Sequence, residues 1–154
     1  MRIRKTQIED IERVLQIYQY AREQMKVNGN PNQWGDNRPS RETIENDIIQ
    51  RNSYVMEEDG KVHGVFVFIV GEEPTYQMIE QGGWLNDMPY GTIHRIASDG
   101  SVPGMLGECL NYCENIISNI RIDTHRDNKI MQHLIEKHGF QKCGIIYVED
   151  KRLA

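Results

Sequence analysis

The sequence predicts an α/β fold in which a mixed β-sheet carries helices on both faces. Apolar runs of strand length alternate with amphipathic stretches of helical length along the 154 residues. The run at residues 65–70 is apolar without alternation, which is typical of a strand covered on both sides. Read from the N-terminus, the elements are expected in the order β-α-α-β-β-β-α-β-α-β.

The first short strand is followed by a predicted helix start. Thr6 and Glu9 have the spacing of a capping box, in which the Thr6 oxygen takes the Glu9 amide proton and the Glu9 side chain reaches back. The helix ends at a polar loop, residues 28–39, that carries Trp34. Ser40 then caps a second helix.

A β-hairpin and a long loop are predicted next. Residues 54–57 and 61–70 flank the turn signal Glu58-Asp59-Gly60, so both runs are expected to be strands of one hairpin. The following segment, residues 71–91, mixes aromatic residues with Pro, Gly and acids. Long loops in compact domains tend to carry function, and this one is expected to border a site.

The C-terminal half reads as two strand-helix units and a last strand. Residues 92–97 form a strand, 98–104 a glycine-rich loop and 105–117 a helix, which is a layout that can hold phosphate. Residues 120–124 are the next strand, Asp127 caps a helix to about Lys137, and Gly139 ends it. A last strand is expected at residues 140–148, although the chain stops early enough to leave it short or missing.

Charge and composition exclude several classes of function. The net charge of −5 and the pI near 5.5 argue against nucleic acid as a partner. No apolar run is long enough to span a membrane and the N-terminus lacks the pattern of a signal peptide. The odd count of three cysteines fits free thiols in the cytoplasm. No linker or repeat divides the chain, so residues 1–154 are expected to be one domain.

With this order of elements, residues 127–140 resemble the GNAT superfamily of acetyl-CoA-dependent N-acetyltransferases. The string Glu136-Lys137-His138-Gly139-Phe140, after a capped helix and before a strand, is similar to the family's Glu-Lys-x-Gly-Phe. Ile96 and Ala97, leading into residues 100–107 and a helix, stand where the family has its acetyl-CoA pyrophosphate loop. The resemblance covers nearly the whole chain.

The resemblance implies a sheet that splays between its fourth and fifth strands, residues 92–97 and 120–124, with acetyl-CoA held in the gap. Backbone amides of the fourth strand would bind the pantetheine arm, and amides at a helix N-terminus would bind the pyrophosphate. No metal is needed. The cofactor-binding residues it implies are Ile96, Ala97, Ser101, Val102, Gly104, Met105, Leu106 and Asn128. For Asn128 the alternative is a simple helix cap.

Two departures from the family stand out. The family loop usually reads Gln/Arg-x-x-Gly-x-Gly/Ala, whereas here Ser101 leads it, Leu106 replaces the second small residue and Pro103 lacks an amide proton. Ile135 stands where many members have the tyrosine that protonates the leaving thiolate. Because a CoA thiolate is a tolerable leaving group, this second change lowers the rate without forbidding the reaction.

His94 is the candidate catalytic base, because it lies on the fourth strand just before Ile96 and titrates near neutral pH. It shares the side-chain parity of Ile96, so the alternative is a hydrogen-bonded core histidine. Four aromatic residues are the candidate acceptor-binding residues, with plain packing over the core edge as the alternative for the two tryptophans. They are Trp34, Tyr76, Trp84 and Tyr90.

The sequence therefore indicates an N-acetyltransferase that moves acetyl from acetyl-CoA to a primary amine by direct attack in a ternary complex. The alternative from another class is a non-catalytic acyl-CoA-binding or regulatory module, and a third is an unrelated α/β binding domain. A homodimer is compatible with the resemblance. The acids of the long loop are expected to be solvated, and they could also attract a cationic acceptor.

Overall fold

The computed structural model describes residues 1–147, which form a five-stranded sheet in the order β1-β2-β3-β4-β5. Strands β1 to β4 pair antiparallel, and β4 and β5 pair parallel. The predicted mixed sheet is therefore confirmed. The strands are β1 (Arg2–Lys5), β2 (Ser53–Glu58), β3 (Lys61–Val70), β4 (Gly91–Ser98) and β5 (Ile120–Ile122).

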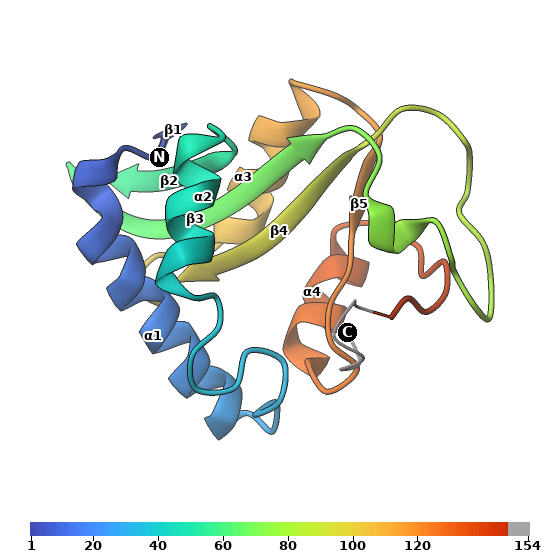
Figure 1. Ribbon diagram of the computed structural model, residues 1–154, viewed down its shortest axis with the longest axis horizontal. Coiled ribbons are helices and arrows are strands. Elements are labelled where there is room, and N and C mark those ends of the chain that lie inside the picture. The colour runs from blue at the N-terminus through green and yellow to red at the C-terminus, as the bar shows by residue number, and fades with distance from the viewer. Residues whose placement is uncertain (148–154) are drawn as a thin grey trace.

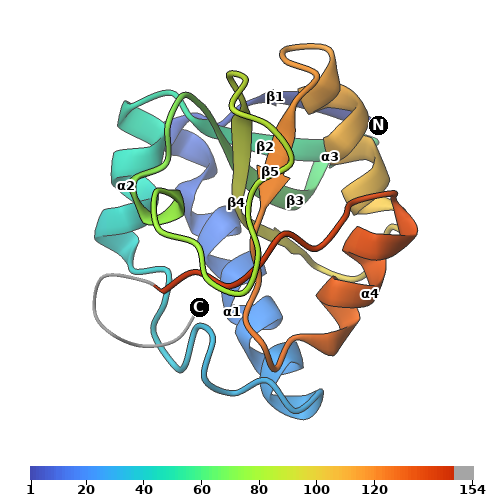
Figure 2. The ribbon, with the colours of Figure 1, turned by 90° about the vertical axis from the view of Figure 1, so that its right-hand side faces the viewer.

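Helices cover both faces of this sheet, as predicted (Figure 1). On one face lie α1 (Ile11–Val27) and α2 (Arg41–Ile49), which pack on Val55, Val65 and Ala97. The opposite face carries α3 (Met105–Glu114), and α4 (Lys129–Lys137) packs against the same apolar cluster (Figure 2).

Strand β3 lies at the centre of the core. Val65 and Val67 alternate with Phe66 and Phe68, and all four side chains are buried. Val65 faces the α1 side, whereas both phenylalanines face the α3 side. The unalternating apolar run thus has the predicted cause, a strand covered on both sides.

The first helical segment starts one residue later than the capping box predicted, with a 3-10 turn at Ile8–Asp10, and α1 itself starts at Ile11. The Thr6 hydroxyl lies 2.7 Å from the Ser53 hydroxyl of β2 and is buried, so it does not cap a helix. Instead the Gln7 amide donates to Asp10 at 2.8 Å, and a single 3-10 turn leads into α1. The prediction for Ser40 is confirmed, because its oxygen accepts from the Thr43 amide at the start of α2.

The C-terminal elements are shorter than predicted. Helix α3 ends at Glu114, β5 has three residues, and α4 is capped by Asn128 rather than Asp127. Gly139 follows α4 with a φ of +92°, which confirms the predicted left-handed helix end.

The predicted last strand is wrong within the described residues, which include all of it except Val148. Residues 140–147 run beside the loop between β3 and β4, where Ile145 makes one isolated bridge with Glu80. Ile146 is buried with Tyr76 and Tyr90, so the segment packs on that loop instead of pairing along the short β5. Among residues 1–147 no helix combines the length and the apolar character needed to cross a membrane.

Candidate functional site

The central feature of the site is the divergence of β4 from β5. The two strands pair at only three positions, the last of which joins Ile93 to Ile122. Beyond it, residues 94–98 continue to pair with β3 on one side, while no described strand pairs with them on the other. An extended ligand could add to this free side through main-chain hydrogen bonds.

A β-bulge in β4 decides which side chains face the splay. Val67 pairs with His94 and Val65 with Ala97, so two residues of β4 oppose the single residue Phe66 of β3. The bulge is at Arg95, whose φ is +48°.

Because of the extra residue, His94 and Ile96 point to opposite faces of the sheet, although strand alternation predicts the same face. Ile96 packs on the α3 side. His94 instead interacts electrostatically with Asp47 of α2, and Arg95 bonds to the same carboxylate. The expectation that His94 and Ile96 share a face is therefore wrong, because the parity argument assumed a regular strand.

Arg95 is held by two contacts from the helices on its face. Its guanidinium donates two hydrogen bonds to Asp47, at 2.9 and 2.6 Å. Its carbonyl accepts a hydrogen bond from the Tyr18 hydroxyl of α1 at 2.7 Å. Because Asp47 is 6% exposed, this bidentate pair is largely shielded from water.

His94 lies beside the splay in a setting that keeps it neutral. Its Nε2 atom is buried and 3.3 Å from Oε1 of Glu73, without the geometry of a hydrogen bond. Burial lowers the pKa of His94 below its usual 6.5, and Arg95 lowers it further, although Asp123, Glu73 and Asp47 oppose this. A neutral imidazole is the form that can accept a proton from an ammonium or amine.

Three of the four predicted aromatic residues form one cluster, which contacts two of the acids around His94, Glu73 and Asp123. The rings of Tyr76 and Trp84 are 4.9 Å apart, and those of Tyr76 and Tyr90 are 6.3 Å apart. Arg121 of β5 lies over the rings of Trp84 and Tyr90, at 4.2 and 3.9 Å. The Tyr76 hydroxyl donates to Asp123 at 2.6 Å, which ties the cluster to the residue after β5.

Trp34 does not join this cluster. Its ring meets the edge of Tyr18 on α1 with 5.5 Å between ring centres, and it packs with the core on the α1 side. This is the loop-anchor arrangement given as the alternative. The same loop still reaches the site, because Gln33 accepts a hydrogen bond from the Asn128 side chain at 3.0 Å.

The loop after β4 has free backbone amides for an anion at only some of the predicted positions. Gly104 is the N-cap of α3 with a φ of +76°, and nothing stands within 4 Å of where its Cβ would be. The amides of Met105 and Leu106, in the first turn, have no intrahelical acceptor. The amide of Ser101 already donates to Asp99 at 3.0 Å, and the side chain of Val102 packs on the core.

Asp99 organises this loop. Its carboxylate accepts from Arg13 of α1 at 2.6 Å and lies 2.8 Å from Nδ1 of His63. The Ser101 hydroxyl is also 2.8 Å from Nδ1 of His63. Serine and aspartate thus share one ring nitrogen, which is not the geometry of a nucleophilic triad, where they use different nitrogens.

Replacing Asp99 with Asn should destabilise the protein by about 2 kcal/mol at pH 7. Burial raises the pKa of Asp99, but hydrogen bonds from Ser101 and His63 outweigh it and lower the pKa to about 2. A carboxylate with a lowered pKa stabilises the fold above its unfolded pKa near 4 and loses that contribution as the pH falls toward 2. Urea unfolding of both proteins from pH 7 to pH 2 measures the difference.

The gap between the two unfolding curves should close between pH 4 and pH 2. Asp87→Asn, in the exposed part of the long loop, is the matched control and should unfold like the wild type at every pH. A gap that persists unchanged at pH 2 would contradict the role given to the Asp99 charge.

Helix α4 closes the far side of the splay. Asn128 caps it by accepting from the Met131 amide at 3.0 Å, so the capping alternative describes this side chain in the structure. Cofactor contact at Asn128 stays a prediction. Ile135 packs with the α3 cluster, and it also lines a cavity of about 810 Å³ between β5, α4 and residues 138–147.

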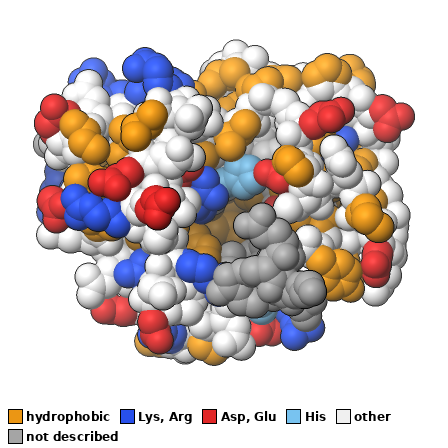
Figure 3. All heavy atoms as spheres, in the orientation of Figure 1, with side chains coloured by type: hydrophobic (Ala, Val, Ile, Leu, Met, Phe, Trp, Pro, Cys, Tyr) orange, Lys and Arg blue, Asp and Glu red, His pale blue; other side chains and the backbone are white. Residues whose placement is uncertain are grey.

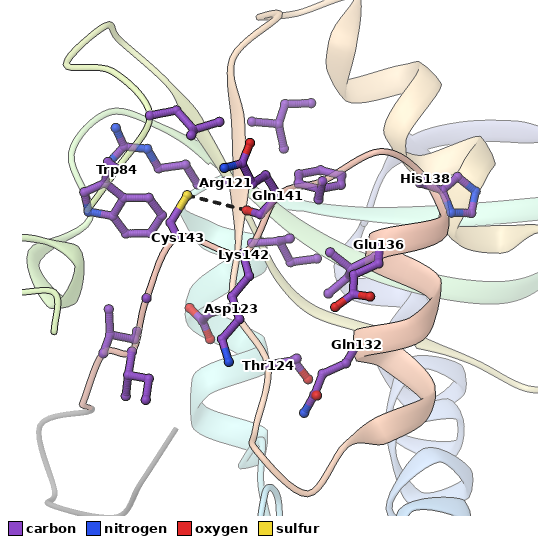
Figure 4. A pocket seen from close by; sticks show the side chains of 18 of the residues that line it. Trp84, Arg121, Asp123, Thr124, Gln132, Glu136, His138, Gln141, Lys142 and Cys143 are labelled. Carbon is purple, nitrogen blue, oxygen red and sulfur yellow. Dashed lines mark hydrogen bonds between the residues drawn. The ribbon is translucent and has the colours of Figure 1, made fainter. Parts of the chain in front are cut away.

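That cavity lies along β5 (Figure 4). Asp123 and Thr124 point into it from the segment that follows β5 and Lys142 from the C-terminal segment, with Gln132 facing them from α4. Trp84 is the one predicted acceptor-binding residue in its lining. A space-filling view shows that the face carrying α1 and α2 is hollowed near its middle (Figure 3).

The acids nearest His94 were missed as site residues. Glu73 was expected to be solvated, with attraction of a cationic acceptor as the alternative, and Asp47 and Asp123 carried no signal, since neither belongs to a recognisable motif. Their proximity follows from tertiary structure, because they belong to the β3–β4 loop, α2 and the end of β5. The nearest sequence signal was the acidic character of the 71–91 loop.

Comparison with solved structures identifies similar folds along the whole chain. A GNAT-family acetyltransferase from Streptococcus agalactiae is 31% identical, with a TM-score of 0.84 over 99% of this chain and 91% of the other. A GNAT-family acetyltransferase from Listeria monocytogenes is 18% identical, with a TM-score of 0.69 over 97% and 90%.

A more distant match shows the fold alone. An aminoglycoside 6'-N-acetyltransferase from Acinetobacter haemolyticus is 11% identical, with a TM-score of 0.60 over all of both chains. No protein-family model matches the sequence, and no curated protein matches it either.

Proposed function

Since the chain belongs to the GNAT family of acetyltransferases, we propose that it transfers acetyl from acetyl-CoA to a primary amine by direct attack in a ternary complex. The observation that carries this proposal is the parting of β4 from β5 directly after Ile93, with His94 as the next residue. A donor lying along residues 94–98 would bring its thioester close to an imidazole that is neutral at pH 7.

The residues around the splay fit a CoA thioester. The free side of β4 at Ile96 and Ala97 suits the pantetheine amides, and the first turn of α3 suits the pyrophosphate. At that turn we assign Gly104, Met105 and Leu106 through their backbone amides. The bound thioester supplies an activated acyl carbon, and a strand amide near Ile96 would polarise its carbonyl oxygen.

His94 would act as the general base. The amine nitrogen forms a bond to the acyl carbon, the carbon–sulfur bond breaks, and the amine gives one proton to the imidazole. The CoA thiolate leaves and takes its proton from water, because Ile135 has none to donate. Asp123 and Glu73, both close to His94, would favour an acceptor that carries positive charge.

We assign the acceptor side of the site to Tyr76, Trp84 and Tyr90, of which Trp84 and Tyr90 stack on Arg121 and Tyr76 donates to Asp123. Trp34 contributes by anchoring the 28–39 loop on Tyr18. We place the reaction in the cytoplasm, since Cys109, Cys113 and Cys143 are free thiols.

Acetyl-CoA should raise the melting temperature by several degrees. At 100 times its dissociation constant a ligand adds about 2.7 kcal/mol to the free energy of unfolding, and about 2–4 °C follow from each kcal/mol in a chain of this size. Thermal unfolding with acetyl-CoA and with CoA measures binding. Thiol release in the presence of primary amines, tested with and without a second positive charge, measures transfer.

The two readouts separate the possible outcomes. A melting shift with amine-dependent thiol release supports the transferase. A shift without release from any amine would replace it with an acyl-CoA-binding module, for which the loss of the family's tyrosine at Ile135 is the motivating feature. No shift at a saturating concentration would overturn the cofactor site at β4 and α3.

A further inference from the structure

Glu73 is held in place more firmly than a surface loop residue. It is the N-cap of a 3-10 turn, and its Oε2 accepts hydrogen bonds from both the amide and the hydroxyl of Thr75, each at 2.9 Å. Its own amide donates to the hydroxyl of the buried Tyr90 at 2.8 Å. The two bonds from Thr75 fix one carboxylate oxygen, the bond to Tyr90 fixes the backbone, and the other oxygen, Oε1, is left facing His94 at 3.3 Å.

His94 is equally constrained from the other side. Its backbone is paired with Val67 of β3, directly before the bulge at Arg95. Nε2 is buried and has no hydrogen-bond partner within the described residues. A buried ring nitrogen without a partner is costly, and a modest rotation of the ring would give it one in Glu73. Hydrogen bonds of this kind are often long in a free enzyme and shorten when substrates bind.

The other charged groups around His94 already have partners of their own. Asp47 accepts two hydrogen bonds from Arg95, and Asp123 accepts one from the Tyr76 hydroxyl. Glu73 is the acid with an oxygen next to the imidazole. The four charged groups around His94 are Asp47 of α2, Arg95 of β4, Glu73 of the β3–β4 loop and Asp123 directly after β5. Among them, Glu73 supplies the contact with the ring.

We propose that Glu73 is a positioning residue for His94. Its Oε1 accepts a hydrogen bond from the protonated Nε2, so that Nδ1 is the unprotonated nitrogen that faces the acceptor amine. This assignment rests on the proposed role of His94 as the base. When Nδ1 receives the amine proton, the ring carries protons on both nitrogens, and the adjacent carboxylate stabilises the resulting positive charge.

Glu73→Gln should reverse the tautomer of His94. The carbonyl oxygen of Gln can keep both bonds to Thr75, so its amide group then faces His94. An amide donates where a carboxylate accepts, so Nε2 must become the acceptor and the ring proton moves to Nδ1. Nitrogen-15 NMR of the imidazole in the free protein should show Nε2–H in the wild type and Nδ1–H in the variant.

Kinetics provide the second readout. Removing the negative charge should move the acidic limb of the pH profile of kcat/KM to lower pH by about one unit. It should also lower kcat roughly 10–100-fold, because the ring is misoriented and its protonated form is less stabilised. Glu72→Gln is the matched control, since Glu72 is the exposed neighbouring acid, and it should change neither the tautomer nor the profile.

The proposal fails if the wild-type ring already carries its proton on Nδ1, or if Glu73→Gln leaves the tautomer and the acidic limb unchanged. Either outcome would leave the proposed base untouched. Conversely, full activity in His94→Gln would remove His94 as the base, whereas the NMR result would still report whether Glu73 sets the tautomer. The two failures are thus distinguishable.

Discussion

His94→Ala is expected to lower kcat/KM for acetyl transfer by roughly 10²- to 10⁴-fold, the range that general-base catalysis typically contributes. The acceptor amine must lose a proton as it attacks, and His94 is the neutral imidazole next to the free side of β4. The affinity for acetyl-CoA should change little, because residues 94–98 would bind it through the backbone.

The pH profile supplies a sharper form of the same prediction. Burial lowers the pKa of His94, so the wild-type kcat/KM should rise with pH along a limb whose midpoint lies below 6.5. In His94→Ala that limb should vanish. His133→Ala is the matched control, because His133 is exposed on α4, and it should retain both the rate and the limb.

Stopped assays of thiol release from pH 5 to pH 9, with acetyl-CoA at saturation, measure both effects. Titration of each variant with CoA, followed by its melting temperature, separates loss of chemistry from loss of binding. An unchanged rate in His94→Ala with the limb still present would show that a water or another group takes the proton. The assignment of the base would then be withdrawn.

Most of the fold could be predicted from the sequence because its elements have strong local signals. Ser40 has the oxygen and the spacing that an N-cap needs, and the apolar run of β3 leaves no face for solvent. The last strand, predicted at residues 140–148, was wrong within the described residues. A further strand can pair only with a neighbouring strand that is long enough, and β5 has three residues. The sequence of residues 140–147 gives no information on the length of β5, and in the structure the segment bridges to Glu80 instead.

The candidate site was less accessible to sequence reasoning, for a specific physical reason. The one-residue bulge at Arg95 reverses which face of the sheet the following side chains of β4 point to. No residue type in β4 predicts this bulge. His94 was selected by its chemistry, whereas its neighbours Glu73 and Asp47 meet it only through the folding of separate segments. Trp34 was selected as an acceptor-binding residue because it is an aromatic residue in a polar loop, but its ring packs on Tyr18 instead.

The same bulge leads to a large expected effect on stability. Asp47→Ala should lower the free energy of unfolding by about 3 kcal/mol, because it leaves the Arg95 guanidinium without its partner in a largely buried position. Arg95 is 27% exposed in its side chain, so water relieves part of the cost that full burial would impose. Glu45→Ala, on the same helix, is the control: Glu45 is half-buried and makes only a surface ion pair with Arg41 at 3.5 Å, so its loss should change stability by at most about 0.5 kcal/mol.

A double-mutant cycle tests whether the two residues act as a pair. Arg95→Ala should also destabilise the protein, but the double variant should lose less than the sum of the single losses, by on the order of 1–3 kcal/mol. Urea unfolding of the four proteins at pH 7 measures this coupling. Additive losses would mean that Asp47 and Arg95 stabilise the fold independently. A strong coupling would instead show that the ion pair stabilises the bulge, and with it the face of β4 on which His94 is presented.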